Sequence, residues 1–276
     1  MCRRGILLFS LISLLWVSGA EASCSGSGTT WNCPAGTTSA DLATGLSNAA
    51  DGATLTFAPG AYTWDTTFVS FDNAKGVTLI CATQGACNVA MSGTLGMNGN
   101  LSGLNNKLYR ISGFNFNISA AANYVVWFYG PGTLARLRID HNNFNAPDGA
   151  TVMYFGPGDN SFTATFYGVI DHNNFSSSGS ISTLIYAGAL NPTPPPSPAG
   201  TANNLFFEDN TIAITTMTNA DRTCVDGWGN NNLVLRHNTS TNCVWASHGA
   251  THSGGPANIE FYNNSITVNA QAEPNY

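Results

Sequence analysis

The sequence predicts an all-β solenoid, in which one chain winds through stacked coils of parallel strands. Three observations predict this fold: a repeated six-residue phrase, an alternation of apolar and polar residues within it, and an Asn at the same place in most copies. The copies begin at Ile111, Ile139, Ile170, Phe207, Leu235 and Phe261. Successive copies start 28, 31, 37, 28 and 26 residues apart, in or near the range in which internal repeats indicate stacked structural units. Each copy therefore marks one coil.

The phrase predicts a strand that ends in a sharp turn. Leu137 and Ile139 alternate with Arg138 and Asp140, which is the period of two of a β-strand. Asn tolerates a left-handed backbone and bonds to nearby backbone groups, so we expect the Asn to form the turn. Because stacked coils repeat about every 4.8 Å, like residues lie over like. The expected structural Asn ladder comprises Asn142, Asn173, Asn210, Asn238 and Asn264.

This pattern resembles the right-handed parallel β-helix proteins, the pectate-lyase-like superfamily that also includes polygalacturonases. The resemblance covers Ala40 to Asn269. It implies a single-stranded right-handed parallel β-helix. It says less about activity, because one fold hosts many unrelated chemistries.

The N-terminus predicts export. Arg3 and Arg4 precede an apolar run from Ile6 to Val17, and small residues follow it up to Ala22, as in a secretory signal peptide. We assign residues 1–22 to the signal and 23–276 to the β-helix domain. A lipoprotein with a lipidated Cys24 is the alternative. We expect a secreted protein, extracellular, periplasmic or on the cell surface, with no membrane span.

A short helix is expected to cover the first coil. Leu42, Leu46 and Ala49 have helical spacing, with Ser39 or Asp41 as the N-cap. An open solenoid end needs such a helical cap.

The segment 191–200 is rich in proline and must loop outside the sheets. Too few residues follow Asn269 to cover the last coil, so we expect a fragment or an incomplete gene; cover by another molecule and a tail that folds back are the alternatives.

The cysteines predict disulfides. Removal of Cys2 with the signal leaves six, an even number that favours a disulfide framework in an exported chain. Metal binding is the alternative, but no Cys-x-x-Cys spacing supports it. Three close pairs are expected: Cys24–Cys33, Cys81–Cys87 and Cys224–Cys243.

The charge disfavours nucleic acid as a partner. Signal cleavage removes Arg3, Arg4 and Glu21 and leaves seven basic against fourteen acidic side chains. A nucleic-acid-binding protein usually carries a basic stripe. The resemblance implies a polysaccharide as the partner, and we expect a monomer.

Two polar columns are expected on the outside of the coils. The first holds Asp140, Asp171 and Glu208, and the second holds His141, His172 and His237. Stacked carboxylates repel one another unless a cation lies between them, so the acids form a candidate site for calcium or substrate. Ordinary solvent-facing or turn-satisfying roles are the alternative.

The densest polar group lies near the C-terminus. Asp226 and His248 are 22 residues apart, close to one coil, with Arg222 and His252 nearby. An acid and an imidazole so placed can serve in glycosidic cleavage. Ser247-His248-Gly249 is similar to one polygalacturonase motif, whereas that family's Asn-Thr-Asp and Asp-Asp motifs are missing here.

Two function classes follow. One is a polysaccharide lyase or glycoside hydrolase that acts on a cell-wall or acidic polysaccharide, with catalytic residues Asp226, His248, Arg222 and His252. The other is a non-catalytic surface, adhesion or glycan-binding solenoid.

Overall fold

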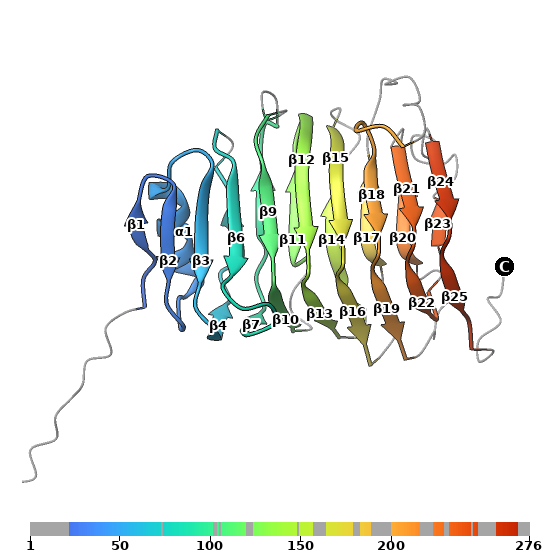
Figure 1. Ribbon diagram of the computed structural model, residues 1–276, viewed down its shortest axis with the longest axis horizontal. Coiled ribbons are helices and arrows are strands. Elements are labelled where there is room, and N and C mark those ends of the chain that lie inside the picture. The colour runs from blue at the N-terminus through green and yellow to red at the C-terminus, as the bar shows by residue number, and fades with distance from the viewer. Residues whose placement is uncertain are drawn as a thin grey trace, which may run out of the picture.

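Successive coils of the chain add strands to three sheets that run side by side along one axis in the computed structural model (Figure 1). The structure describes residues 22–72, 74–101, 104, 106–119, 124–147, 149–156, 164–178, 183–188, 200–215, 223–228, 232–243, 245–247 and 258–269. Consecutive triplets of strands, from β3, β4 and β5 to β21, β22 and β23, each form one coil. The predicted β-solenoid is therefore confirmed.

Sheet A contains the strands that lead into the repeated phrase. Its neighbours are parallel except β1 and β2, which form an antiparallel pair. In order, the strands are β1 (Ser25–Ser27), β2 (Thr30–Cys33), β3 (Ala53–Phe57), β6 (Val77–Cys81), β9 (Tyr109–Ser112), β12 (Gly132–Asp140), β15 (Ala164–Asp171), β18 (Leu205–Glu208), β21 (Asn232–Arg236) and β24 (Asn258–Tyr262).

Sheets B and C complete each coil. Sheet B comprises β4 (Gly60–Trp64), β7 (Cys87–Met91), β10 (Phe114–Ile118), β13 (Asn143–Ala146), β16 (Asn174–Ser177), β19 (Thr211–Ile214), β22 (Thr239–Thr241) and β25 (Ser265–Thr267). Sheet C comprises β5 (Val69–Ser70), β8 (Leu95–Asn98), β11 (Val126–Tyr129), β14 (Thr151–Phe155), β17 (Thr183–Gly188), β20 (Thr223–Trp228) and β23 (Trp245–Ser247).

Apolar columns fill the interior between the sheets. Phe116, Phe144 and Phe175 occupy one position of sheet B on successive coils, and their rings stack at 5.2 and 5.1 Å. All three are buried, and burial of each such side chain contributes roughly 1.5–3 kcal/mol. Ile212 continues the column and Ser240 interrupts it.

The corner between sheets A and B is the sharp turn that the repeat predicts, but the left-handed residue is not the Asn. It is the residue before it: His141, His172, Asp209, His237 and Asn263 have φ values of 55 to 59°, and Gly113 takes this place in an earlier coil with φ 83°. His, Asp and Asn are enriched among non-glycine residues in this region. The turn prediction was therefore wrong by one position.

The Asn side chains point inward and bond from coil to coil. Oδ1 of Asn173 accepts hydrogen bonds from the backbone N–H of Asn142 at 3.0 Å and from its side-chain Nδ2 at 3.1 Å. Nδ2 of Asn173 donates to the carbonyl of Ile139 at 2.8 Å and to Oδ1 of Asn210 at 3.1 Å. The same bonds recur through Asn238 to Asn264, so the ladder satisfies buried backbone groups at each corner.

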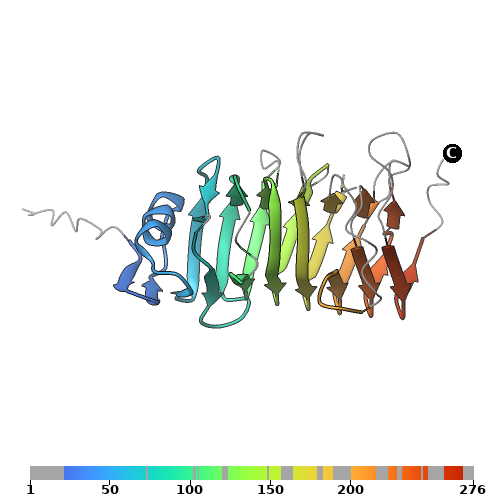
Figure 2. The same cartoon turned by 90° about the horizontal axis from the view of Figure 1, so that it is seen from above.

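Helix α1 (Ser39–Asn48) lies at the N-terminal end of the stack (Figure 2). Its apolar residues Leu42 and Leu46 are buried. The N-cap is Thr38, whose side chain forms a reciprocal capping box with Asp41, so the assignment to Ser39 or Asp41 was wrong: Ser39 is already the first helical residue.

No helix among the described residues has the length and apolar character that a membrane span requires.

Three disulfides form between the cysteine pairs that the sequence predicts. Cys24 is bonded to Cys33, Cys81 to Cys87 and Cys224 to Cys243. The third joins β20 to the segment between β22 and β23, and because β20 pairs with β23, it links successive coils.

Candidate functional site

The outer face of sheet C carries aromatic side chains on neighbouring coils. On β11, Val126 and Phe128 are fully buried in the interior, so the alternate residues Trp127 and Tyr129 face outward and are half-buried. Tyr154 of β14 pairs with Trp127 and continues its column. Apolar residues on both sides of a strand are unusual where one side faces solvent, which marks this face as a candidate site.

Five aromatic residues form one cluster here, which we call the aromatic platform: Phe68, Tyr124, Trp127, Tyr129 and Tyr154. Trp127 lies at its centre, with ring centroids 5.5 Å from Tyr124, 5.5 Å from Tyr129, 5.7 Å from Phe68 and 6.3 Å from Tyr154. Tyr124 also contacts Tyr154 at 5.1 Å. The rings mostly meet edge to face or tilted, arrangements that aromatic pairs favour, so each ring holds its neighbours in place.

The indole of Trp127 brings a polar group into the platform. Its Nε1 is shielded from solvent and has no hydrogen-bond acceptor within the described structure. Buried Trp N–H groups usually find a partner. The platform therefore offers a ligand an apolar aromatic surface, with the indole N–H held beneath it.

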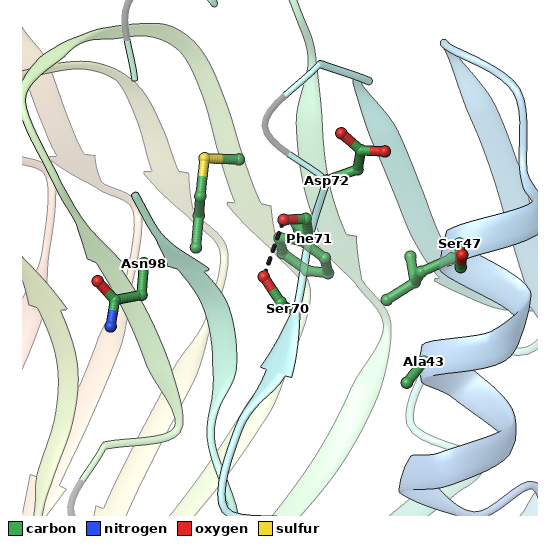
Figure 3. Close-up of a pocket in the computed structure, with 8 residues that line it drawn as sticks. Ala43, Ser47, Ser70, Phe71, Asp72 and Asn98 are labelled. Atoms are coloured by element: carbon green, nitrogen blue, oxygen red, sulfur yellow. Dashed lines mark hydrogen bonds between the residues drawn. The ribbon is translucent and has the colours of Figure 1, made fainter. Parts of the chain in front are cut away.

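A pocket of about 350 Å³ lies at the N-terminal end of the same face (Figure 3). Ser70, Asp72 and Asn98 supply its polar wall, Phe71 and Met97 its apolar wall, and α1 closes the other side with Ala43, Leu46 and Ser47. The pocket is next to the platform, because Asn98 pairs with Tyr129 and Ser70 lies in the column that continues through Gly96 to Trp127.

Asp226 lies in the column of Trp127, farther toward the C-terminus. The register runs from Trp127 to Tyr154, to the backbone of Tyr186 and to Asp226, so Asp226 is three strands from Trp127. It is only 3% exposed. The predicted partners Arg222, His248 and His252 lie outside the described residues.

The acidic column occupies a different face. Asp140, Asp171 and Glu208 end strands of sheet A, and Asp140 and Asp171 are buried rather than exposed as expected. Arg110 donates to both carboxylate oxygens of Asp140 at 2.7 and 2.6 Å. Arg138 donates to Asp171 at 3.1 Å, and Arg236 to Glu208. These guanidinium groups balance the charge that a calcium ion would otherwise balance.

Arginine contacts also set the protonation of this cluster. Burial alone would raise the pKa of Asp140, but hydrogen bonds from Arg110 and His141 and the attraction of Arg110 and Arg138 lower it on balance. The hydrogen bond to Asp140 raises the pKa of Arg110. The pair therefore remains charged.

The histidine column stacks along the turn. The rings of His141 and His172 are parallel and 5.0 Å apart, and each Nδ1 lies 2.9 Å from the carboxylate of the preceding residue, Asp140 or Asp171. In the described part of the chain, no group of three or more His, Cys, Asp or Glu residues has an arrangement that would hold a metal ion.

The aromatic platform was not expected from the sequence. Phe68 and Tyr124 precede strands and the other members lie on two different strands, so only the coil register brings them together. One signal was present: the run Val126-Trp127-Phe128-Tyr129 lacks the apolar-polar alternation that Leu137 to Asp140 show. No protein-family model and no curated protein matches this chain.

Proposed function

We propose that this is an exported glycan-binding protein that holds a polysaccharide on the outer face of sheet C. The observation that carries the proposal is the aromatic platform beside a pocket with polar walls. Sugar rings have C–H-rich faces that pack on aromatic rings, whose large apolar surfaces dominate contact energies. Binding sites commonly combine such surfaces with a few placed polar groups.

Three other features support it. The disulfides suit an oxidising compartment outside the cytosol, as does the signal peptide that the sequence predicts. Tyr129 and the exposed Asn98 pair across neighbouring strands about 4.8 Å apart. An extended chain of sugars that crosses the strands can therefore contact several coils at once.

The test is truncation of the central ring. Trp127→Ala should weaken binding to a retained polysaccharide at least about 10-fold, since loss of a central aromatic contact commonly costs more than about 1.4 kcal/mol. Affinity electrophoresis on gels that contain single polysaccharides measures it. Tyr262→Ala is the matched control, because Tyr262 is an aromatic residue of sheet A with 37% exposure and should leave binding unchanged. Equal retention of both variants contradicts the proposal.

Cleavage of the bound glycan is a second candidate function. Asp226 favours it, because this acid lies in the column of the platform and is shielded from solvent, so a chain on the platform would pass over its strand. In that case Asp226→Asn should lower turnover by about 10² to 10⁴ while binding remains. Reducing ends and the ultraviolet absorbance of unsaturated sugars report hydrolysis and elimination. Release of neither product by the native protein leaves glycan binding as the function.

A further inference from the structure

We infer that the glycan held on sheet C is neutral rather than acidic; this rests on the proposed function. The strands of sheet C contain no Lys or Arg. Among the described residues, Asp226 lies in the platform column and Asp72 in the pocket wall. A polyanion would therefore find no basic side chain on these strands, and Lys75 beside the pocket already pairs with Asp72.

The basic side chains of the described chain are engaged elsewhere. Arg110, Arg138 and Arg236 pair with acids of sheet A. Lys107 pairs with Asp51. Such pairs leave little free positive charge to attract an anionic ligand.

The two remaining cations in the described part are also accounted for. Lys75 lies near the pocket, but its ammonium is 3.3 Å from the carboxylate of Asp72 and donates to the carbonyl of Ser47 at 2.9 Å. Arg136 donates to the carbonyl of Asn106 at 3.1 Å. Arg222, which lies outside the described residues, is the one other cation of the sequence after the signal, and the test below includes it.

The polar groups that the face does offer are uncharged donors and acceptors. They are the exposed amide of Asn98 and the hydroxyl of Ser70. Such groups match sugar hydroxyls, which both donate and accept. Selection between neutral and acidic glycans then follows from the missing cations, because an anionic sugar would lose its hydration without gaining a charged partner.

The experiment compares neutral and acidic polysaccharides at two salt concentrations. The full mature chain is titrated with soluble β-glucan, galactan and mannan and with polygalacturonate and alginate. We expect binding to a neutral glycan with affinities that agree within about twofold between 50 and 500 mM salt, because screening weakens only interactions between charges. Asn98→Ala, which removes an exposed amide from the pocket wall, should weaken binding about 2- to 10-fold, the range for one hydrogen bond. Ser70→Ala is a second variant at the pocket, and unchanged melting temperatures show that both variants fold.

The outcomes separate the two proposals. Binding to acidic glycans alone, with an affinity that falls with salt and is lost in Arg222→Gln, overturns the neutral ligand but leaves glycan binding in place. No binding to any polysaccharide overturns the proposed function itself. Full affinity of Ser70→Ala and Asn98→Ala for a neutral glycan removes the role assigned to their polar groups and contradicts the inference.

Discussion

Asp140 illustrates how a single buried charge is held in this fold. Its side chain is fully buried, yet it receives two hydrogen bonds from Arg110, one from Ser112 at 3.1 Å and a contact from His141. A buried carboxylate without such partners would be strongly destabilising. The cluster therefore stabilises the junction of β9 and β12 while it keeps the charge away from sheet C.

The lowered pKa of Asp140 makes stability depend on pH in one direction. The folded protein binds this proton less readily than the unfolded chain, so the stabilising contribution is present above the ordinary pKa of 3.8 and is lost as the pH falls through the lower folded-state pKa. Asp140→Asn should cost about 1–3 kcal/mol at neutral pH, because Arg110 loses its charged partner. Urea unfolding between about pH 7 and pH 2 should show the difference from the native protein shrinking only at the acid end.

Asp209→Asn is the matched control for Asp140→Asn. Asp209 is exposed and left-handed, and Asn263 takes the equivalent place in a later coil, so this change removes a charge without straining the turn. A similar loss of stability in both variants would show that charge number, and not the Arg110 contact, is responsible.

Among the structural elements, the corner between sheets A and B is where the sequence prediction and the structure agree most closely. The Asn column was predictable because it recurs at one place in the repeat. The left-handed residue was misplaced because His, Asp and Asn can all adopt that backbone, and the sequence alone does not say which of two neighbours does. The arginine partners were not predictable, because Arg110 and Asp140 lie on different coils and meet only when the register is known. The capping role of α1 stays a prediction.

Removal of one rung tests the Asn ladder. Asn173→Ala leaves the N–H of Asn142 and the carbonyl of Ile139 without their partners, and each buried group left unpaired costs roughly 1–3 kcal/mol. Its exposed neighbour Asn174, which donates to Asn143 at 2.8 Å, is the control, and Asn174→Ala should change the free energy of unfolding by no more than about 0.5 kcal/mol. Chemical denaturation measures both. Equal effects would contradict a structural role for the buried ladder.

Over the whole molecule, each coil contacts chiefly its neighbours, so the stability of the solenoid is close to a sum over coils and their interfaces. The disulfide between Cys224 and Cys243 adds a covalent link between successive coils, of a kind that typically contributes about 2–4 kcal/mol. The parallel stacking followed from the repeat. The hand of the coil stays a prediction, supported by the strong preference of parallel connections for the right hand.

The geometry of the whole molecule also explains why the sequence did not predict the aromatic platform. The repeat reveals only residues that recur from coil to coil, such as the Asn and the apolar columns. Residues that make one face distinctive do not recur: the column of Trp127 contains Gly96 on one side and Tyr154 on the other. Periodicity therefore finds the scaffold and misses the residues that set it apart.

The uniform A–B corner has a consequence for how such a molecule can diversify. From β12 to β25 that corner holds two residues in each coil, whereas the connections on either side of sheet C differ widely in length, as between Tyr129 and Gly132 or Gly188 and Leu205. Insertions at the corner would break the bonded ladder, but insertions beside sheet C leave every rung in register. Loops inserted in the connections beside sheet C would thus change the surroundings of the platform and leave the stacked coils unchanged. This property suits both the natural evolution of binding specificity and laboratory evolution.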